Sequence, residues 1–160
     1  MLILPPGCPA QSRIAGPASS CTVSRVSDGD SFHCRDGRRV RLIGMDSPES
    51  QQHPLGATAR AALLKLLPVG SIVRLEPDVA QRDQYGRSLA YVWVGSTLVN
   101  EAMVRDGWAA LYTVPPNVKY AERLEAAQNE ARARGTGLWA QRGFDCLPSE
   151  FRRRRCVSSP

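Results

Sequence analysis

The sequence has little histidine, no paired-cysteine motif and no long apolar run. Its 160 residues include only His33 and His53, and none of the five cysteines forms a CxxC pair, which disfavours zinc-ribbon and thioredoxin-like proteins. No stretch approaches the roughly 18 to 20 apolar residues that cross a bilayer, so we expect no membrane span. With 42% hydrophobic and 22% charged residues, the composition is typical of one compact globular domain and excludes a fibrous or wholly disordered chain.

Lysine is also scarce, although the chain is basic. Only Lys65 and Lys119 accompany 19 arginines, and the formal net charge is +6. Arginine forms bidentate contacts with phosphate, and a basic total permits an anionic partner such as nucleic acid. Five of the arginines lie in residues 141–160, where a solvated tail would produce the same total. Both interpretations of this tail remain open.

The five cysteines favour structural disulfides in a protein that works outside the cytoplasm. Cys21 and Cys34 flank a predicted hairpin centred on Gly29. A symmetric register places Cys34 opposite Ser24, so a direct bridge between the two cysteines requires a β-bulge. Cys146 is an alternative partner for either one. We therefore expect at least one disulfide among Cys21, Cys34 and Cys146.

The first ten residues, MLILPPGCPA, lack the basic segment of a complete secretory signal. Residues 1–20 are rich in Pro, Gly, Ala and Ser, which predicts a flexible leader that is the remnant of a processed or misannotated start. Residues 21–140 form the expected folded domain. Residues 141–160 form a basic C-terminal extension.

Short alternating runs separated by Asp-Gly turns predict a three-stranded meander after residue 21. A helix, two more strands and two further helices follow, and Leu89, Tyr91 and Trp93 lie on one face of the last strand. The expected strands are 22–27, 31–35, 39–45, 71–76 and 87–94, and the expected helices are 55–67, 100–106 and 119–134. This order predicts an α+β fold, a five-stranded OB-fold Greek-key β-barrel with three packed α-helices.

Four carboxylates gather at the turns and ends of the predicted meander. The motifs DGD and MDSPE carry Asp28, Asp30, Asp46 and Glu49. Converging anionic oxygens require a cation or arginines to neutralise them, and hard oxygen ligands favour calcium or magnesium. Arg41 and Arg87 are candidates for the same pocket. Each residue alone has an ordinary explanation as a turn residue or a solvated arginine, but the combination indicates a site.

Four strings occur in an order and spacing that strongly resemble the staphylococcal nuclease family, also called the thermonuclease or SNase-like family. They are VSDGDSF, VRLIGMDSPE, RDQYGRSLAYVW and LVNEAMVRDGWA. The resemblance covers about residues 22–140. It implies an OB-fold barrel with three helices and a calcium-dependent phosphodiesterase. Such an enzyme hydrolyses DNA and RNA and leaves 3′-phosphate and 5′-hydroxyl ends.

The resemblance also implies roles for individual residues. The implied metal ligands are Asp30, Asp46 and Ser47, the catalytic residues are Arg41, Glu49 and Arg87, and the nucleotide-contacting residues are Tyr85 and Tyr112. Ser47 stands where the family usually has Thr, and its backbone carbonyl is the implied ligand. Glu49 is implied as the general base, Arg41 and Arg87 as the phosphate-binding pair, and Asp28 as an outer acid. For either tyrosine, half-buried packing is the alternative interpretation.

Some positions depart from the family pattern. The segment SQQHPL between Glu49 and Gly56 is shorter than the family's mobile loop and lacks its lysines. Gln84 replaces a basic residue, and Val114 stands where Tyr is frequent. These differences predict weaker or differently selective substrate binding.

The leading hypothesis is a monomeric nuclease that is secreted or periplasmic, with calcium as its cofactor and DNA and RNA as its substrates. The alternative is a non-catalytic SNase-like module that binds nucleic acid or protein. Degenerate modules are expected to lose the acids and arginines of the site. Here Asp30, Asp46, Glu49, Arg41 and Arg87 are all present, which favours the enzyme.

Overall fold

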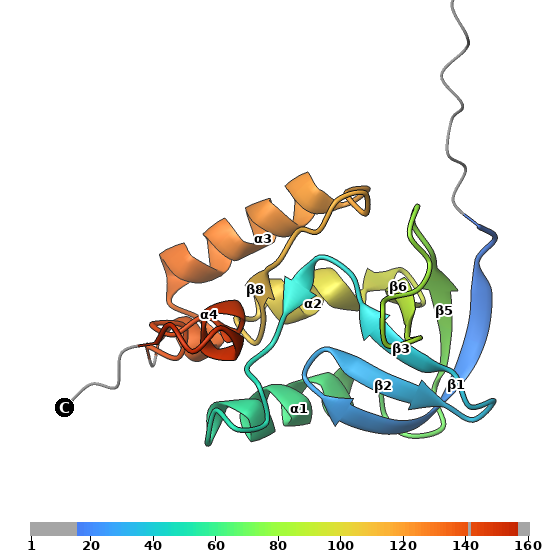
Figure 1. The fold of residues 1–160 in the computed structure, drawn as a ribbon, viewed down its shortest axis with the longest axis horizontal. Coiled ribbons are helices and arrows are strands. Elements are labelled where there is room, and N and C mark those ends of the chain that lie inside the picture. Colours follow the sequence, from blue (N-terminus) through green and yellow to red (C-terminus); the bar gives the residue numbers. More distant parts are fainter. Residues whose placement is uncertain (1–15, 141, 157–160) are drawn as a thin grey trace, which may run out of the picture.

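A closed five-stranded β-barrel forms the centre of the protein (Figure 1). The computed structural model describes residues 16–140 and 142–156. The barrel strands are β1 (Ser19–Asp28), β2 (Ser31–Cys34), β3 (Arg39–Leu42), β5 (Ile72–Glu76) and β6 (Ser88–Val94). The pairs β1–β2, β2–β3, β1–β5 and β5–β6 are antiparallel, and a parallel pairing of β3 with β6 closes the barrel. Together with the packed helices, this confirms the predicted α+β fold of OB type.

The predicted meander is present, but it starts earlier and ends differently. Ser19 and Ser20, which the sequence analysis assigned to the leader, pair with Leu75 and Arg74 as the first residues of β1. The rest of the predicted leader up to residue 15 lies outside the described residues.

The predicted strand 39–45 breaks at Gly44, whose φ of 79° suits glycine, so β3 is followed by a separate β4 (Met45–Asp46). Strand β4 pairs with β8 (Ala110–Leu111), a strand that we did not predict. This break turns the chain out of the barrel and brings Asp46 to its mouth.

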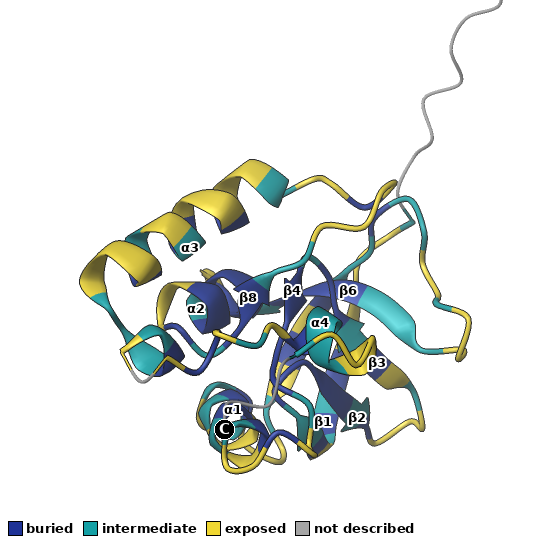
Figure 2. Ribbon diagram, turned by 60° about the vertical axis from the view of Figure 1, so that its left-hand side comes forward, coloured by how far each residue is buried: buried dark blue, intermediate teal, exposed yellow. Residues whose placement is uncertain are grey.

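Three helices cover the barrel, as expected. They are α1 (Leu55–Leu66), α2 (Val99–Arg105) and α3 (Ala121–Arg134), and β7 (Thr97–Leu98) leads into α2. The predicted apolar stripe of α3 is buried at Leu124, Ala127 and Ala131, while the opposite face of this helix is exposed (Figure 2). The helix ends at Gly135, which adopts the left-handed conformation with φ 61°.

The core lies inside the barrel and beneath the helices. Val23, Phe32, Leu42, Leu63 and Met103 are buried in one apolar cluster. The predicted face of β6 packs in a second cluster, which contains the fully buried Tyr91 and against which the partly buried Leu89 and Trp93 pack. No helix within residues 16–140 and 142–156 is long and apolar enough to cross a membrane.

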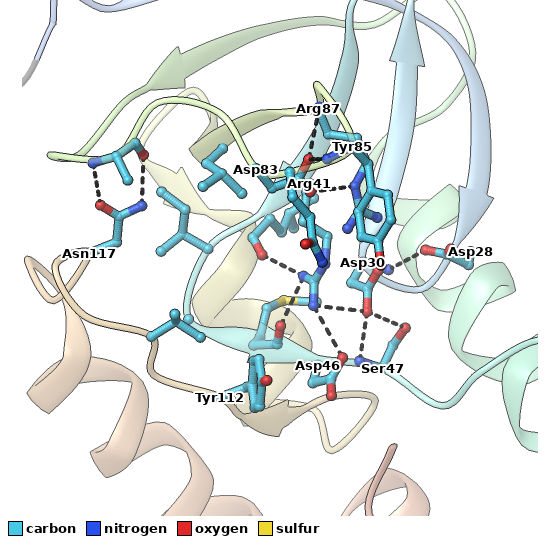
Figure 3. Close-up of a pocket in the computed structure, with 18 of the residues that line it drawn as sticks. Asp28, Asp30, Arg41, Asp46, Ser47, Asp83, Tyr85, Arg87, Tyr112 and Asn117 are labelled. Carbon is cyan, nitrogen blue, oxygen red and sulfur yellow. Dashed lines mark hydrogen bonds and ion pairs between the residues drawn. The ribbon is translucent and has the colours of Figure 1, made fainter. Parts of the chain in front are cut away.

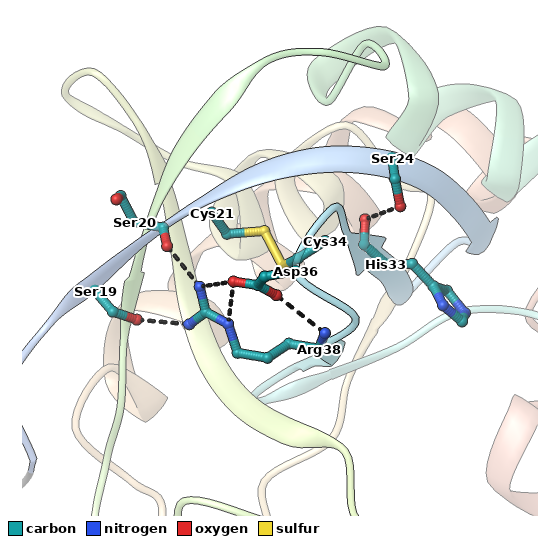
Figure 4. The surroundings of a disulfide bond; sticks show 8 residues. All are labelled: Ser19, Ser20, Cys21, Ser24, His33, Cys34, Asp36 and Arg38. Atoms are coloured by element: carbon teal, nitrogen blue, oxygen red, sulfur yellow. Dashed lines mark hydrogen bonds and ion pairs between the residues drawn. A yellow bond between two sulfur atoms is a disulfide. The ribbon is translucent and has the colours of Figure 1, made fainter.

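The cysteines form two disulfides. Cys21 bonds to Cys34 across β1 and β2, with Cα atoms 5.7 Å apart (Figure 4). The strands are irregular between Val23 and Arg25, which places Val23 rather than Ser24 opposite Cys34. The irregularity supplies the bulge that the bridge requires and confirms the expected disulfide.

Cys146 bonds to Cys156, so the alternative that Cys146 pairs with Cys21 or Cys34 is wrong. Sequence spacing could not identify this pair, because the chain between the two cysteines turns back on itself in a short helix. Cys8 lies outside the described residues.

The C-terminal extension is folded where the structure describes it. A 3₁₀ turn (Gly137–Trp139) leads to Phe144, whose ring lies 4.6 Å from that of Trp139. A short helix, α4 (Pro148–Arg152), follows between Cys146 and Cys156. Helix α4 lies beside β4 at the mouth of the barrel, with its last residue in contact with Asp46.

Candidate active site

All eight site residues that the sequence predicts line one pocket at the mouth of the barrel. Figure 3 labels each of them except Glu49. The cavity has a volume of about 490 Å³. Its walls come from the β1–β2 turn, the β3–β4 bend, the 83–87 turn, the segment 112–117 and the end of α4. The pocket therefore joins segments that lie more than 100 residues apart in the chain.

Arg41 lies at the centre of this pocket and connects two aspartates. Its Nη2 atom is 3.1 Å from Asp46 Oδ1 and 3.4 Å from Asp30 Oδ2. Its Nη1 atom donates to the backbone carbonyls of Leu42 and Met45, at 2.6 and 2.9 Å. The bend at Gly44 brings both carbonyls to the same guanidinium, so the local backbone fixes the direction of the Arg41 side chain.

Asp30 is held by the chain that follows β4. Its Oδ2 atom accepts hydrogen bonds from the Ser47 backbone N–H at 3.0 Å and from Ser47 Oγ at 3.1 Å. Burial alone would raise the pKa of Asp30, but Arg41 and these hydrogen bonds hold that pKa below its usual value. Asp30 is therefore a buried, ionised carboxylate.

Asp28 supports the turn between β1 and β2 that carries Asp30. Its Oδ1 atom accepts hydrogen bonds from the backbone N–H of Asp30 at 3.0 Å and from Ser31 Oγ at 2.8 Å. Burial and the neighbouring charge of Asp30 raise the pKa of Asp28 to about 7. Asp28 shapes the turn that presents Asp30.

The donor chemistry of Asp30, Asp46 and Ser47 fits a hard divalent cation. Both carboxylates are buried, contact the same Arg41 nitrogen and are oxygen donors of the kind that Ca²⁺ and Mg²⁺ prefer. In the described part of the chain no group of three or more His, Cys, Asp or Glu side chains is arranged around a metal position. An ion here would depend on the two aspartates, with backbone oxygen and water completing its shell.

Arg152 contacts two of the predicted site carboxylates. Its Nη1 and Nη2 atoms lie 3.0 and 2.8 Å from the two carboxylate oxygens of Asp46, and Nη1 lies 2.6 Å from Glu49 Oε1. Its guanidinium carbon is 5.5 Å from the centre of the Tyr112 ring. Burial raises the pKa of Asp46 although Arg152 and Arg41 oppose this, and the two carboxylates raise the pKa of Arg152.

Arg87 and Tyr85 form the opposite wall of the pocket. Asp83 holds this turn, because its carboxylate accepts hydrogen bonds from Arg87 Nε at 2.6 Å and from the backbone N–H groups of Arg87 and Tyr85 at 3.0 and 2.9 Å. The Arg87 guanidinium lies 5.5 Å from the centre of the Tyr85 ring, which is 63% exposed at the mouth. The exposed ring can stack on a planar ligand.

Sequence reasoning missed two members of the site. Asp83 could have been found from its i, i+4 spacing to Arg87 within the motif DQYGR. Arg152 could have been suspected because a run of four arginines lies between Cys146 and Cys156. The departures Gln84 and Val114 also line the pocket, so they are in a position to affect what it binds.

Comparison with known proteins agrees with this geometry. The family described as "Staphylococcal nuclease homologue" matches residues 39–141. A thermonuclease of Staphylococcus intermedius is 41% identical over 128 residues, which are 75% of this chain and 76% of the relative. A thermonuclease of Staphylococcus hyicus is 38% identical over 126 residues, 74% of each chain. The endonuclease YncB of Bacillus subtilis (strain 168) is 32% identical over 133 residues, 77% of this chain and 63% of the relative. The chain belongs to the staphylococcal nuclease family.

Proposed function

We propose that the protein is a calcium-dependent nuclease that hydrolyses phosphodiester bonds in DNA and RNA. The observation that carries the proposal is the convergence of two buried aspartates, a glutamate and two arginines on one pocket. The names thermonuclease and endonuclease of the relatives support the same reaction class.

In this proposal Asp30, Asp46 and the backbone carbonyl of Ser47 hold the calcium ion. The bound ion would supply positive charge to the scissile phosphate and to the water beside it. The chain's own contribution is to oppose the effect of burial on both aspartates. Arg41 contacts each of them, and Ser47 donates two hydrogen bonds to Asp30, whose pKa is lowered. This arrangement supports binding of a cation by a site that is otherwise buried.

Arg41 and Arg87 offset the negative charge that grows on the equatorial phosphate oxygens. Arg41 is oriented by the carbonyls of Leu42 and Met45, and Arg87 by Asp83. Donors that are already oriented require no reorganisation during the reaction, and each is worth about 10² to 10³ in rate. The two arginines therefore bind the phosphate more tightly in the transition state than in the ground state.

Glu49 acts as the general base. It takes a proton from water, the oxygen of that water forms a bond to phosphorus, and the bond from phosphorus to the 5′ oxygen breaks. The 5′ oxygen takes a proton from solvent, Glu49 releases the proton that it accepted to solvent, and the phosphate stays on the 3′ side. Tyr85 and Tyr112 would contact the nucleotides, since an aromatic face stacks on any base without sequence preference.

We propose that the enzyme works as a monomer outside the cytoplasm, either secreted or periplasmic. Two disulfides support an oxidising compartment, and a calcium site of modest affinity suits surroundings in which calcium is abundant. Thiol titration of the unfolded, unreduced protein after expression in an oxidising compartment should find fewer than five free thiols, because Cys21, Cys34, Cys146 and Cys156 are bonded in pairs. Five free thiols would contradict this placement.

The test of the proposed function is digestion of denatured DNA and of RNA, first with calcium and then with excess chelator. We expect cleavage with calcium and none with chelator, with 3′-phosphate ends on the products. Binding without cleavage would identify the non-catalytic module instead. Equal cleavage in chelator would contradict the metal site.

A further inference from the structure

The C-terminal segment closed by Cys146 and Cys156 places a positive charge on the site carboxylates. The guanidinium of Arg152 meets both oxygens of Asp46 and one oxygen of Glu49. In the proposed function, these two carboxylates are a metal ligand and the general base. The inference rests on that function and concerns what Arg152 does to it.

The charges explain why an arginine is stable in this position. The Asp46 side chain is only 3% exposed, and a buried carboxylate requires a counter-charge. Arg41 and Arg152 supply two positive charges to Asp30, Asp46 and Glu49. A bound Ca²⁺ together with Arg41 would supply three, which match the three carboxylates without Arg152.

The segment between Cys146 and Cys156 holds Arg152 beside the site carboxylates and leaves its side chain able to move away from them. The disulfide ties the start of α4 to the residues after it, and Gln52 connects this segment to the site. The amide of Gln52 accepts a hydrogen bond from the Glu49 backbone N–H at 2.9 Å and donates one to the Cys146 carbonyl at 3.3 Å. The Arg152 side chain itself is 38% exposed, so it can swing towards solvent without crossing the core.

We propose that Arg152 is a cation of the chain itself that competes with the divalent metal ion for Asp46 and, while it is bound there, holds Glu49 in an ion pair. Metal binding displaces the guanidinium from Asp46 and releases Glu49 from its ion pair. Arg152 therefore lowers the metal affinity of the site and restrains the enzyme when calcium is scarce. The disulfide strengthens this restraint because it keeps Arg152 close to the carboxylates.

The experiment is calcium titration of the purified, oxidised full chain by isothermal titration calorimetry. Arg152→Gln should lower the dissociation constant for Ca²⁺ by at least about fivefold, because a cation on a shared carboxylate repels the incoming ion. Arg153→Gln is the matched control. It removes the same charge from the neighbouring, exposed position and should stay within about twofold of the wild type.

Two further variants test the mechanism. Arg152→Lys keeps the charge and should stay closer to the wild type than Arg152→Gln. Replacing both Cys146 and Cys156 by Ser should strengthen calcium binding in the same direction but by less, since Arg152 remains on a looser segment. Circular dichroism and thermal midpoints test whether each variant is folded. If Arg152→Gln does not fold, the variant with Ser at positions 146 and 156 still tests the proposal.

Three results would overturn the proposal. The first is an unchanged or weakened calcium affinity in Arg152→Gln. The second is a higher KM for DNA at saturating calcium with no change in calcium affinity, which would make Arg152 a substrate contact. The third is the absence of calcium binding in both the wild type and Arg152→Gln. Failure of the proposed function is distinguishable, because it would appear as no cleavage by any variant or as cleavage that is equal with calcium and with chelator.

Discussion

The two disulfides close segments of similar length in different surroundings. Cys21 and Cys34 are 13 residues apart, are 4% and 3% exposed, and belong to the main apolar cluster of the barrel. Cys146 and Cys156 are 10 residues apart and only half-buried, and the helix between them ends on the site carboxylates. The first bond stabilises the barrel itself. The second closes the segment that carries Arg152, and we infer that similar cross-links serve stability in one region and site geometry in the other.

The surroundings of the first disulfide support this interpretation. Arg38, in the turn after β2, donates hydrogen bonds to Ser19 Oγ at 2.9 Å and to the Ser20 carbonyl at 2.6 Å, and it pairs with Asp36 (Figure 4). The disulfide and Arg38 both connect the start of β1 to the end of the β2–β3 hairpin. They hold together strands that are adjacent in the closed barrel.

The largest expected effect is a loss of turnover, and it should follow substitution of the proposed catalytic residues that line the pocket. Arg87→Ala or Glu49→Gln should lower turnover by at least about 10², because each removes a charge stabiliser or the base. Steady-state kinetics on denatured DNA, with a thermal midpoint for each variant, measures this. Comparable turnover in a folded Arg87→Ala protein would refute its assigned role.

The second effect separates the two disulfides directly. Replacing Cys21 and Cys34 by Ser should lower the free energy of unfolding by about 3 kcal/mol, the entropy of closing a loop of this size. The Cys146 and Cys156 replacement should cost the barrel less than about 1 kcal/mol, because its segment can detach without unfolding the core. Urea unfolding followed by tryptophan fluorescence compares the pairs. Equal losses would abolish the distinction between them.

The third prediction concerns calcium and the repulsion between Asp30 and Asp46. Calcium at a hundred times its dissociation constant should stabilise the fold by about 2.7 kcal/mol through mass action. Thermal melts with calcium and with chelator should show this as a rise in midpoint. A thermal midpoint that does not respond to calcium, together with activity in chelator, would contradict the metal site.

The smallest expected effect is a change in the free energy of unfolding when Glu101 is replaced, and this substitution is a control far from both disulfides. Glu101 on α2 is 7% exposed and pairs with Arg105 and with Arg123 of α3. Burial alone would raise the pKa of Glu101, but the hydrogen bond from Arg123 and the charges of both arginines lower it below the ordinary 4.5. Its contribution to stability is therefore present above pH 4.5 and is lost as the pH falls through the lowered pKa.

Glu101→Gln should cost about 0.5 to 1 kcal/mol at pH 7, because the arginine partners are largely solvated. The difference from the wild type should shrink as the pH falls below 4.5 and through the lowered pKa of Glu101. Urea unfolding at a series of pH values measures it. A difference that grows as the pH falls would show that the pKa of Glu101 is raised rather than lowered.

Much of the fold could be predicted because its signals are local. The Asp-Gly turns at Asp28 and Asp36 limit the first strands, and Gly135 ends α3 where the apolar stripe ends. The predicted site residues come from short strings that keep their own turn geometry, and the structure brings them to one pocket. Their roles remain proposals that the variants above test.

The sequence by itself determined the barrel strands and the three main helices, because alternation, turn residues and helix ends act within a few residues. The strings that resemble the family indicated eight residues of the pocket but not Asp83 or Arg152. Only the tertiary structure decided the split of β3 from β4, the pairing of β4 with β8, and the partner of Cys146. It also decided the place of Arg152, which lies 106 residues after Asp46 in the chain. The same arginine in a solvated tail would have an identical local sequence. What distinguishes the two cases is a buried carboxylate at the other end of the chain that requires a counter-charge.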